Sequence, residues 1–174
     1  MRYKSLTRVL ALDLHPRRFG YVVLERPDRL LDWGVCSYRR KGISTDVLVR
    51  RRLRPLLELW RPSTLVLPDP TGMPRSPNPR THRLLKRIMA EAKNHRVLVR
   101  LLKKMPGEDQ GKRLTKYENA QRVAEQFPAI ARKLPPKRRT WESEDYRMSM
   151  FAAAAVATAY LSRQEAANYN ESPQ

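Results

Sequence analysis

The sequence contains little cysteine and comparatively little acidic charge. Cys36 is its single cysteine, which excludes a disulfide or a cysteine metal cluster within the chain and is typical of a reducing compartment. Residues 1–8 are mostly polar and the apolar run after them contains Asp13, so we expect no secretory signal. The alanine-rich stretch 148–161 is shorter than the roughly 20 residues that span a bilayer. We therefore expect a cytoplasmic protein.

Basic residues outnumber acidic ones along the whole chain. Lys and Arg total 36 against 17 Asp and Glu, which gives a formal net charge of +19. A field of this size favours a polyanionic partner, and nucleic acid is the simplest one. Phosphate contacts make such binding strongly dependent on salt. The basic residues that we expect to contact nucleic acid are Arg39, Arg40, Lys41, Arg50, Arg51, Arg52, Arg75, Arg80, Lys103, Lys104, Lys112, Arg113, Lys137, Arg138 and Arg139.

The hydrophobic pattern predicts one α/β domain over residues 1–164, followed by a polar tail over 165–174. A chain of 174 residues is long enough for one domain with a substantial core. Three β-type segments open it, and helical stripes then alternate with further strands. This order predicts a mixed five-stranded sheet flanked by helices. The expected strands are 9–14, 21–25, 31–38, 64–67 and 97–102.

Four helical segments follow from the same pattern. Pro55 should kink or restart the first, whose apolar stripe runs from Val49 to Trp60. Thr81 can cap the second, and the Thr-x-x-Glu spacing that begins at Thr115 is that of a capping box for the third. The last helix should run from about 143 to 163. Residues 71–80 and 105–112 are expected to be exposed loops.

One carboxylate lies within the first apolar run. Asp13 ends this run, and Gly20-Tyr21 begins a second one after a short turn. In so basic a chain, the partner of an acid near the centre of the sheet can be a metal ion. Alternatively, Asp13 simply ends a strand or pairs with a nearby arginine. His15, on the same strand face, either assists a proton transfer, contacts phosphate, or is a surface histidine.

This order of elements, with an acid on the first strand, resembles the RNase H-like fold. Asp13, six further residues and then Gly20-Tyr21 before an apolar strand are similar to the opening of the RuvC-type Holliday junction resolvases. The resemblance covers nearly the whole chain, including the alanine-rich last helix. It implies a homodimeric endonuclease of DNA recombination and repair that depends on Mg²⁺ or Mn²⁺ and cuts branched DNA.

The chemistry of that family requires clustered carboxylates. Two divalent ions about 4 Å apart activate water and stabilise the leaving oxygen, and such hard ions prefer carboxylate oxygens. Asp13 would be the first ligand. The second is expected at the end of the fourth strand, where the family usually has a glutamate and this sequence has Pro68 and Asp69. If Asp69 fills the position, ligation survives with a shorter reach. If Pro68 fills it, the ligand is lost, because adjacent strand residues face opposite sides.

The last helix departs further from the family pattern. Ala152 stands where the family has an aspartate before its alanine run. The acids Glu142, Glu144 and Asp145 lie about two turns earlier, roughly 11 Å along a helix. The resemblance requires further acidic ligands here, and Asp145, helped by Glu144 or Glu142, can serve as the third metal ligand and catalytic residue only if the helix docks with a shift. The other interpretation is that these acids stabilise the start of a helix through its macrodipole.

Two other functions remain open. A degenerate member of the fold would bind structured DNA without cutting it, and Pro68 and Ala152 favour this reading. An RNA-directed RuvC-like nuclease is the second alternative. His82 and His95 have no matching cysteines, so they give little support to a zinc site. The sequence also contains no glycine-rich phosphate loop.

Overall fold

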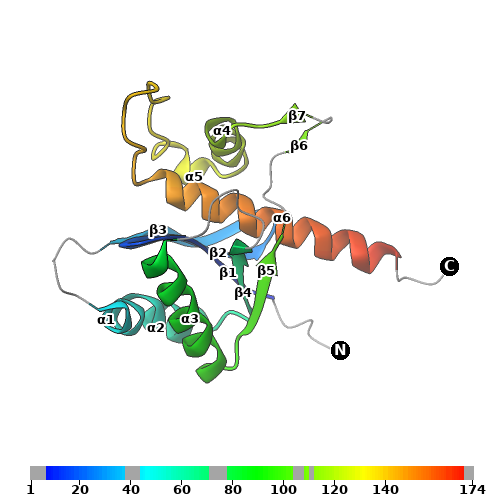
Figure 1. The fold of residues 1–174 in the computed structure, drawn as a ribbon. Helices are drawn as coiled ribbons and strands as arrows, with labels where there is room; N and C mark the ends of the chain where they lie inside the picture. Colours follow the sequence, from blue (N-terminus) through cyan, green and yellow to red (C-terminus); the bar gives the residue numbers. More distant parts are fainter. Residues whose placement is uncertain (1–6, 38–43, 71–77, 104–107, 110–111, 171–174) are drawn as a thin grey trace.

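The computed structural model describes residues 7–37, 44–70, 78–103, 108–109 and 112–170, with only the backbone for 108–109, 112–113 and 168–170. Its centre is a five-stranded sheet with the order β3-β2-β1-β4-β5 (Figure 1). Strands β1, β2 and β3 pair antiparallel, whereas β4 is parallel to β1 and β5 is parallel to β4. The predicted mixed sheet is therefore confirmed. Its strands are β1 Val9–His15, β2 Arg18–Arg26, β3 Arg29–Ser37, β4 Thr64–Pro68 and β5 Leu98–Leu102.

The central strand β1 is buried on both of its faces. Val9 and Ala11 pack into the hydrophobic cluster on one side of the sheet, and Leu10 and Leu12 pack into the cluster on the other. All four side chains are fully inaccessible to solvent. The continuous apolar run that precedes Asp13 is thus the run expected of a strand covered by helices on both sides.

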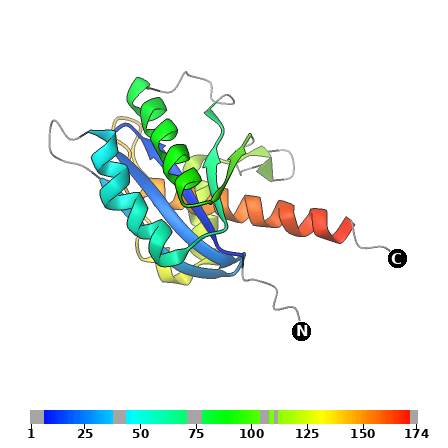
Figure 2. The same ribbon diagram turned by 90° about the horizontal axis from the view of Figure 1, so that it is seen from below.

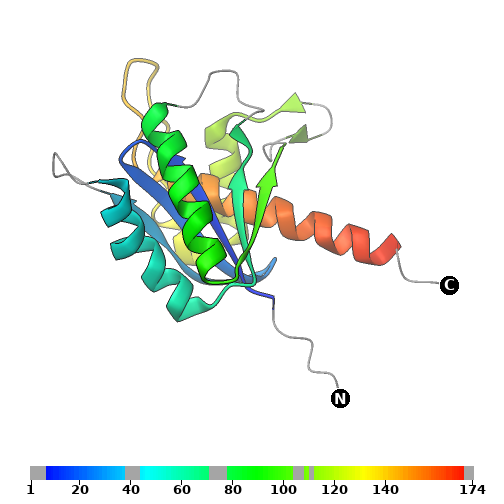
Figure 3. The same cartoon turned by 60° about the horizontal axis from the view of Figure 1, so that its bottom comes forward.

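One face of the sheet is covered by a short helical layer (Figures 2 and 3). The segment predicted as one helix consists of α1, a π-helical turn η1 and α2, and Pro55 lies in the first turn of α2, as a restart requires. Leu53, Leu84, Ile88 and Ala92 are fully buried residues through which this layer packs on the sheet. The elements of the layer are α1 Thr45–Leu48, η1 Val49–Leu53, α2 Arg54–Trp60 and α3 Pro79–Asn94.

Helix α3 begins earlier than its sequence pattern predicts. Its N-cap is Asn78 rather than Thr81, because Oδ1 of Asn78 accepts the backbone N–H of Arg80 at 2.9 Å. Pro79 follows at the first helical position, where its fixed φ suits the helix and its missing N–H is not needed.

The opposite face of the sheet carries the remaining helices (Figure 1). Thr115 and Glu118 form the predicted capping box at the start of the first of them. The alanines of the last helix allow its backbone to approach the sheet closely, and Ala153, Ala154 and Ala157 are fully buried. These helices are α4 Lys116–Gln126, α5 Pro128–Ala131 and α6 Met148–Asn170.

Helix α6 starts at Met148, five residues after the predicted start at Ser143. The reason is local: Oδ1 of Asp145 accepts the backbone N–H of Arg147 at 2.9 Å, a short-range contact that competes with helical geometry. At its other end the helix continues to Asn170, so the domain boundary predicted at 164 falls within it. This distal part of α6 extends beyond the edge of the sheet (Figures 1 and 2).

The two predicted loops are only partly described. In the loop predicted at 105–112, two short strands pair antiparallel: β6 Glu108–Asp109 and β7 Lys112–Arg113. The second strand ends one residue after the predicted loop. In the other loop, residues 71–77 lie outside the described residues. In the described part of the chain, no helix combines the length and the apolar character needed to cross a membrane.

Candidate functional site

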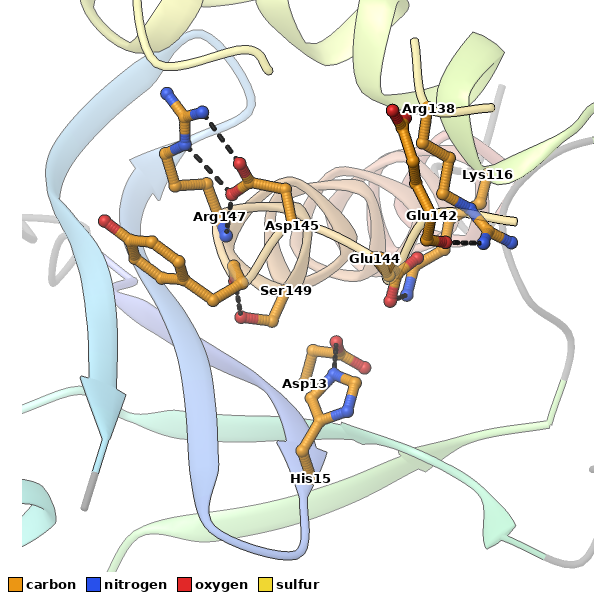
Figure 4. A network of polar contacts seen from close by, with 10 residues as sticks. Asp13, His15, Lys116, Arg138, Glu142, Glu144, Asp145, Arg147 and Ser149 are labelled. Carbon is orange, nitrogen blue, oxygen red and sulfur yellow. Dashed lines mark hydrogen bonds and ion pairs between the residues drawn. The ribbon is translucent and has the colours of Figure 1, made fainter. Parts of the chain in front are cut away.

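Asp13 lies near the end of β1, on the sheet face that α6 covers. Side chains at every second position of a strand share a face, and Val9 and Ala11 pack into the hydrophobic cluster that contains α6. Asp13, two residues after Ala11, is therefore on that side. The residue is 9% exposed, and Nε2 of His15 donates to its Oδ2 at 2.9 Å (Figure 4). Asp13 therefore already has a side-chain partner two residues along its own strand.

Gly20 explains how α6 reaches this position. In the antiparallel ladder Gly20 pairs directly with Asp13. A Cβ atom at residue 20 would lie 2.1 Å from the carbonyl carbon of Ser149 and 2.4 Å from the backbone nitrogen of Met150. Only a glycine permits this approach, so the first turn of α6 rests on β2 next to Asp13. Ser149 is the residue at this contact that the sequence motifs did not identify.

The β1–β4 register decides between Pro68 and Asp69. The parallel ladder pairs Val9 with Thr64 and Ala11 with Val66, and the same register continued by two residues sets Pro68 beside Asp13. The backbone N–H of Asp69 donates to the carbonyl of Leu102 at 3.0 Å, which extends β4 by one residue. Leu67 packs into the cluster on the α3 side, so the alternation of side chains, if it continues past the end of β4, would turn Asp69 toward that face as well. The register therefore favours Pro68, and not the buried Asp69, as the residue beside Asp13.

The acids before α6 are bound to basic groups. The carboxylate of Asp145 accepts both Nε and Nη2 of Arg147, at 2.9 and 2.7 Å, and these hydrogen bonds hold the pKa of Asp145 below its ordinary value. Lys116 donates to Glu144 at 2.8 Å. Figure 4 shows the side chain of Asp145 turned toward Arg147 and that of Glu144 toward Lys116.

Glu142 has a structural partner of a different kind. Its Oε2 accepts the backbone N–H of Arg139 at 2.8 Å and closes a turn in the segment between α5 and α6. Residues 142–145 therefore lie in an irregular approach to α6, which is one of the two placements that the sequence allows; the other is the first turns of the helix. The groups that bind these acids belong to the turns around them or to α4. The sequence pattern near the acids does not reveal these contacts.

These donors do not fit a two-metal centre. Two divalent ions need several carboxylates around one point, whereas Asp13 has His15 as its side-chain partner, and the extended β1–β4 register sets Pro68 beside it. Over the described ranges, no three or more His, Cys, Asp or Glu side chains form a group suited to hold a metal ion. The carboxylate arrangement that the resemblance implies is not assembled.

The histidines are divided between two places. His15 and His82 line a common pocket of about 260 Å³ between the ends of β1 and β4 and the start of α3. His95 lies at the other end of α3, where its Nδ1 is 3.6 Å from Oε1 of Glu91. His82 and His95 therefore lie at opposite ends of α3 and do not form a common zinc site.

Most predicted nucleic-acid contacts that the structure describes are at the surface. Arg50, Arg51 and Arg52 are consecutive and exposed on η1, and Arg80 and Lys103 are exposed at the ends of α3 and β5. Lys137, Arg138 and Arg139 are exposed in the segment between α5 and α6. For Lys112 and Arg113 only the backbone is described. The predicted contacts outside the described residues are Arg39, Arg40, Lys41, Arg75 and Lys104.

The strand order and the two helical layers define an RNase H-like fold of the RuvC type. A solved structure of Thermus thermophilus RuvC is similar to this chain with a TM-score of 0.62 and 17% sequence identity, covering 91% of this chain and 97% of that one. A structure of T. thermophilus RuvC in complex with a Holliday junction substrate matches with a TM-score of 0.56 and 16% identity, covering 91% and 96%. At such identities the likeness establishes the fold alone. No protein-family model and no curated protein matches the sequence.

Proposed function

We propose that this chain binds branched DNA through its basic surface. The support is a formal net charge of +19, with exposed arginines and lysines in both helical layers and in the segment before α6. Such a surface attracts phosphates, and the regular spacing of phosphates along DNA allows many separate contacts that each add to the affinity. The RuvC-like fold adds a reason to choose branched DNA, because one solved structure of this fold holds a Holliday junction substrate.

We further propose that binding proceeds without two-metal cleavage. The observation that supports this proposal is the β1–β4 register, which pairs Ala11 with Val66 and, if continued by two residues, brings Pro68 beside Asp13. Proline offers no side-chain ligand, and the carboxylates of Glu144 and Asp145 are held by Lys116 and Arg147. Asp13 and His15 then form a polar pair at the end of β1 rather than part of a complete metal site.

The second candidate function is a Mg²⁺- or Mn²⁺-dependent endonuclease, on DNA or on RNA. The observation in its favour is Asp13 itself, a buried carboxylate on the first strand of a RuvC-like sheet. Glu144 and Asp145 would have to leave their basic partners, Lys116 and Arg147, and turn toward it.

Binding is tested with matched substrates. A four-way DNA junction, a linear duplex of the same arm sequences and the corresponding RNA duplex are titrated with the protein at fixed salt, without divalent metal. We expect the junction to bind most tightly. Equal affinity for the three substrates would contradict recognition of branched DNA, and a preference for RNA would move the proposal to an RNA partner. Light scattering during size-exclusion chromatography tests the homodimer that the resemblance predicts.

A further inference from the structure

An exposed tryptophan stands at the tip of a braced turn between α5 and α6. Trp141 is 76% exposed. The backbone N–H of Glu142 donates to the carbonyl of Arg139 at 3.1 Å, and the Glu142 carboxylate accepts the N–H of Arg139 at 2.8 Å. A third hydrogen bond runs from Nη1 of Arg138 to the carbonyl of Glu142, at 2.6 Å. These contacts hold the turn that presents Trp141 to solvent.

The other two tryptophans contribute to the interior. Trp60 is half-buried, and its Nε1 donates to Asp32 at 2.9 Å. Trp33 packs against the cluster on the α6 side of the sheet. Trp141 belongs to neither of the two hydrophobic clusters. A single exposed aromatic side chain is common at protein surfaces, but the braced turn holds this ring in a fixed position from which it can stack on a ligand.

The surroundings of Trp141 are basic. Lys137, Arg138 and Arg139 directly precede the turn and are exposed. The guanidinium carbon of Arg139 lies 5.7 Å from the centroid of the Trp141 ring, within the range of a cation–π contact. The ligand that such a surface suits carries negative charge and a flat apolar ring together. Nucleotides with unpaired bases have both features, whereas the bases of an intact duplex are already stacked on one another.

We propose that Trp141 stacks on an unpaired nucleobase, while the neighbouring arginines and lysine contact the flanking phosphates. This inference rests on the proposed nucleic-acid binding and specifies it: the segment 137–142 recognises single-stranded or unstacked nucleotides, such as those at a branch point. Stacking accepts any base, so the contact confers selectivity for unpaired structure and not for sequence.

The test uses an oligothymidine and a linear duplex as separate probes of the full chain. Trp141→Ala should weaken binding of the oligothymidine about tenfold, as expected for the loss of one base–aromatic stack, and leave duplex binding nearly unchanged. Trp141→Phe, which keeps a ring, should retain most of the affinity. Tryptophan fluorescence of the unmodified chain should be quenched by the oligothymidine, and much less so in Trp141→Phe, because Trp33 and Trp60 then supply the signal.

The control is Leu59→Ala, which truncates another exposed apolar side chain, 68% exposed on α2, and should leave both affinities unchanged. Circular dichroism and thermal unfolding check that each variant folds. If Trp141→Ala binds the oligothymidine as tightly as the unmodified chain, or weakens duplex and oligothymidine equally, the stacking inference is wrong although nucleic-acid binding stands. If the unmodified chain binds neither probe nor a four-way junction, the proposed function fails as well.

Discussion

The backbone of Ser149 contacts Gly20 so closely that a Cβ atom on residue 20 would lie 2.1 Å from the Ser149 carbonyl carbon. Gly20 is also the partner of Asp13 in the β1–β2 ladder. One contact between a glycine and a helix start therefore fixes both the docking of α6 and the environment of Asp13. This contact explains sterically why residue 20 of the Gly20-Tyr21 motif is a glycine.

Gly20→Ala should destabilise the protein by about 3 kcal/mol, because the methyl group meets backbone atoms that cannot rotate away. Urea unfolding followed by circular dichroism measures the loss. Gly34→Ala is the matched control, since a Cβ atom there meets only the Tyr21 side chain, at 3.0 Å or more, and this side chain can shift. We expect it to cost less than about 1 kcal/mol. Equal losses at the two glycines would contradict the close packing of α6 on β2.

Stability should fall in acid partly through Glu91. Nε of Arg54 donates to Oε1 of Glu91 at 2.6 Å, and this hydrogen bond lowers the pKa of Glu91 below its ordinary value of 4.5. The folded-state pKa lies below the unfolded one, so the unfolded chain binds more protons as the pH falls. The contribution is therefore present above about pH 4.5 and is lost as the pH drops through the folded-state pKa.

Glu91→Gln should lower the free energy of unfolding at pH 7, and its difference from the unmodified chain should narrow below pH 4.5. Denaturant unfolding over a series of pH values measures this. Glu58→Gln, which changes an exposed carboxylate on α2, is the control and should lower the free energy of unfolding at pH 7 much less. A deficit for Glu91→Gln that stays the same at all pH values would show that the charge of Glu91 is not its cause.

The three arginines of η1 are predicted to contact phosphates without reading bases. Replacing Arg50, Arg51 and Arg52 with glutamine should weaken binding to junction and duplex alike. If all three contact phosphates, the slope of log K against log salt should decrease by about 2.7. Filter binding at several salt concentrations measures the slope. Replacing the same three residues with lysine keeps the charge and should keep most of the slope. If the glutamine variant has an unchanged slope, the three arginines of η1 do not contact phosphates.

The sequence predicts well those features that depend on short-range patterns. The apolar run before Asp13 predicts a central strand, and the spacing of Thr115 and Glu118 predicts the capping box; both are present. The order of strands and helices predicts a mixed sheet covered by helices, because that order allows few topologies. The RuvC-like fold is predicted from the resemblance that Asp13 and Gly20-Tyr21 carry.

The arrangement around Asp13 depends on contacts between distant residues, and these are not evident from local patterns. The choice between Pro68 and Asp69 is fixed by the register of two strands more than fifty residues apart in the sequence. The partner of Glu144, Lys116, comes from α4. An acid near a helix start looks the same in the sequence whether it faces a metal, a dipole or a lysine. Asp13 is thus predictable as a buried acid, whereas the basic partners that hold Glu144 and Asp145 are not.

The most direct test is incubation of a labelled four-way DNA junction with the protein in Mg²⁺ and in Mn²⁺, with Thermus thermophilus RuvC as the positive control. The unmodified chain and Asp13→Asn are compared under conditions in which a mobility shift shows that the junction is bound. We predict that both chains bind the junction and that neither yields metal-dependent cleavage products. Metal-dependent cleavage by the unmodified chain that disappears in Asp13→Asn would contradict this account and establish the endonuclease instead.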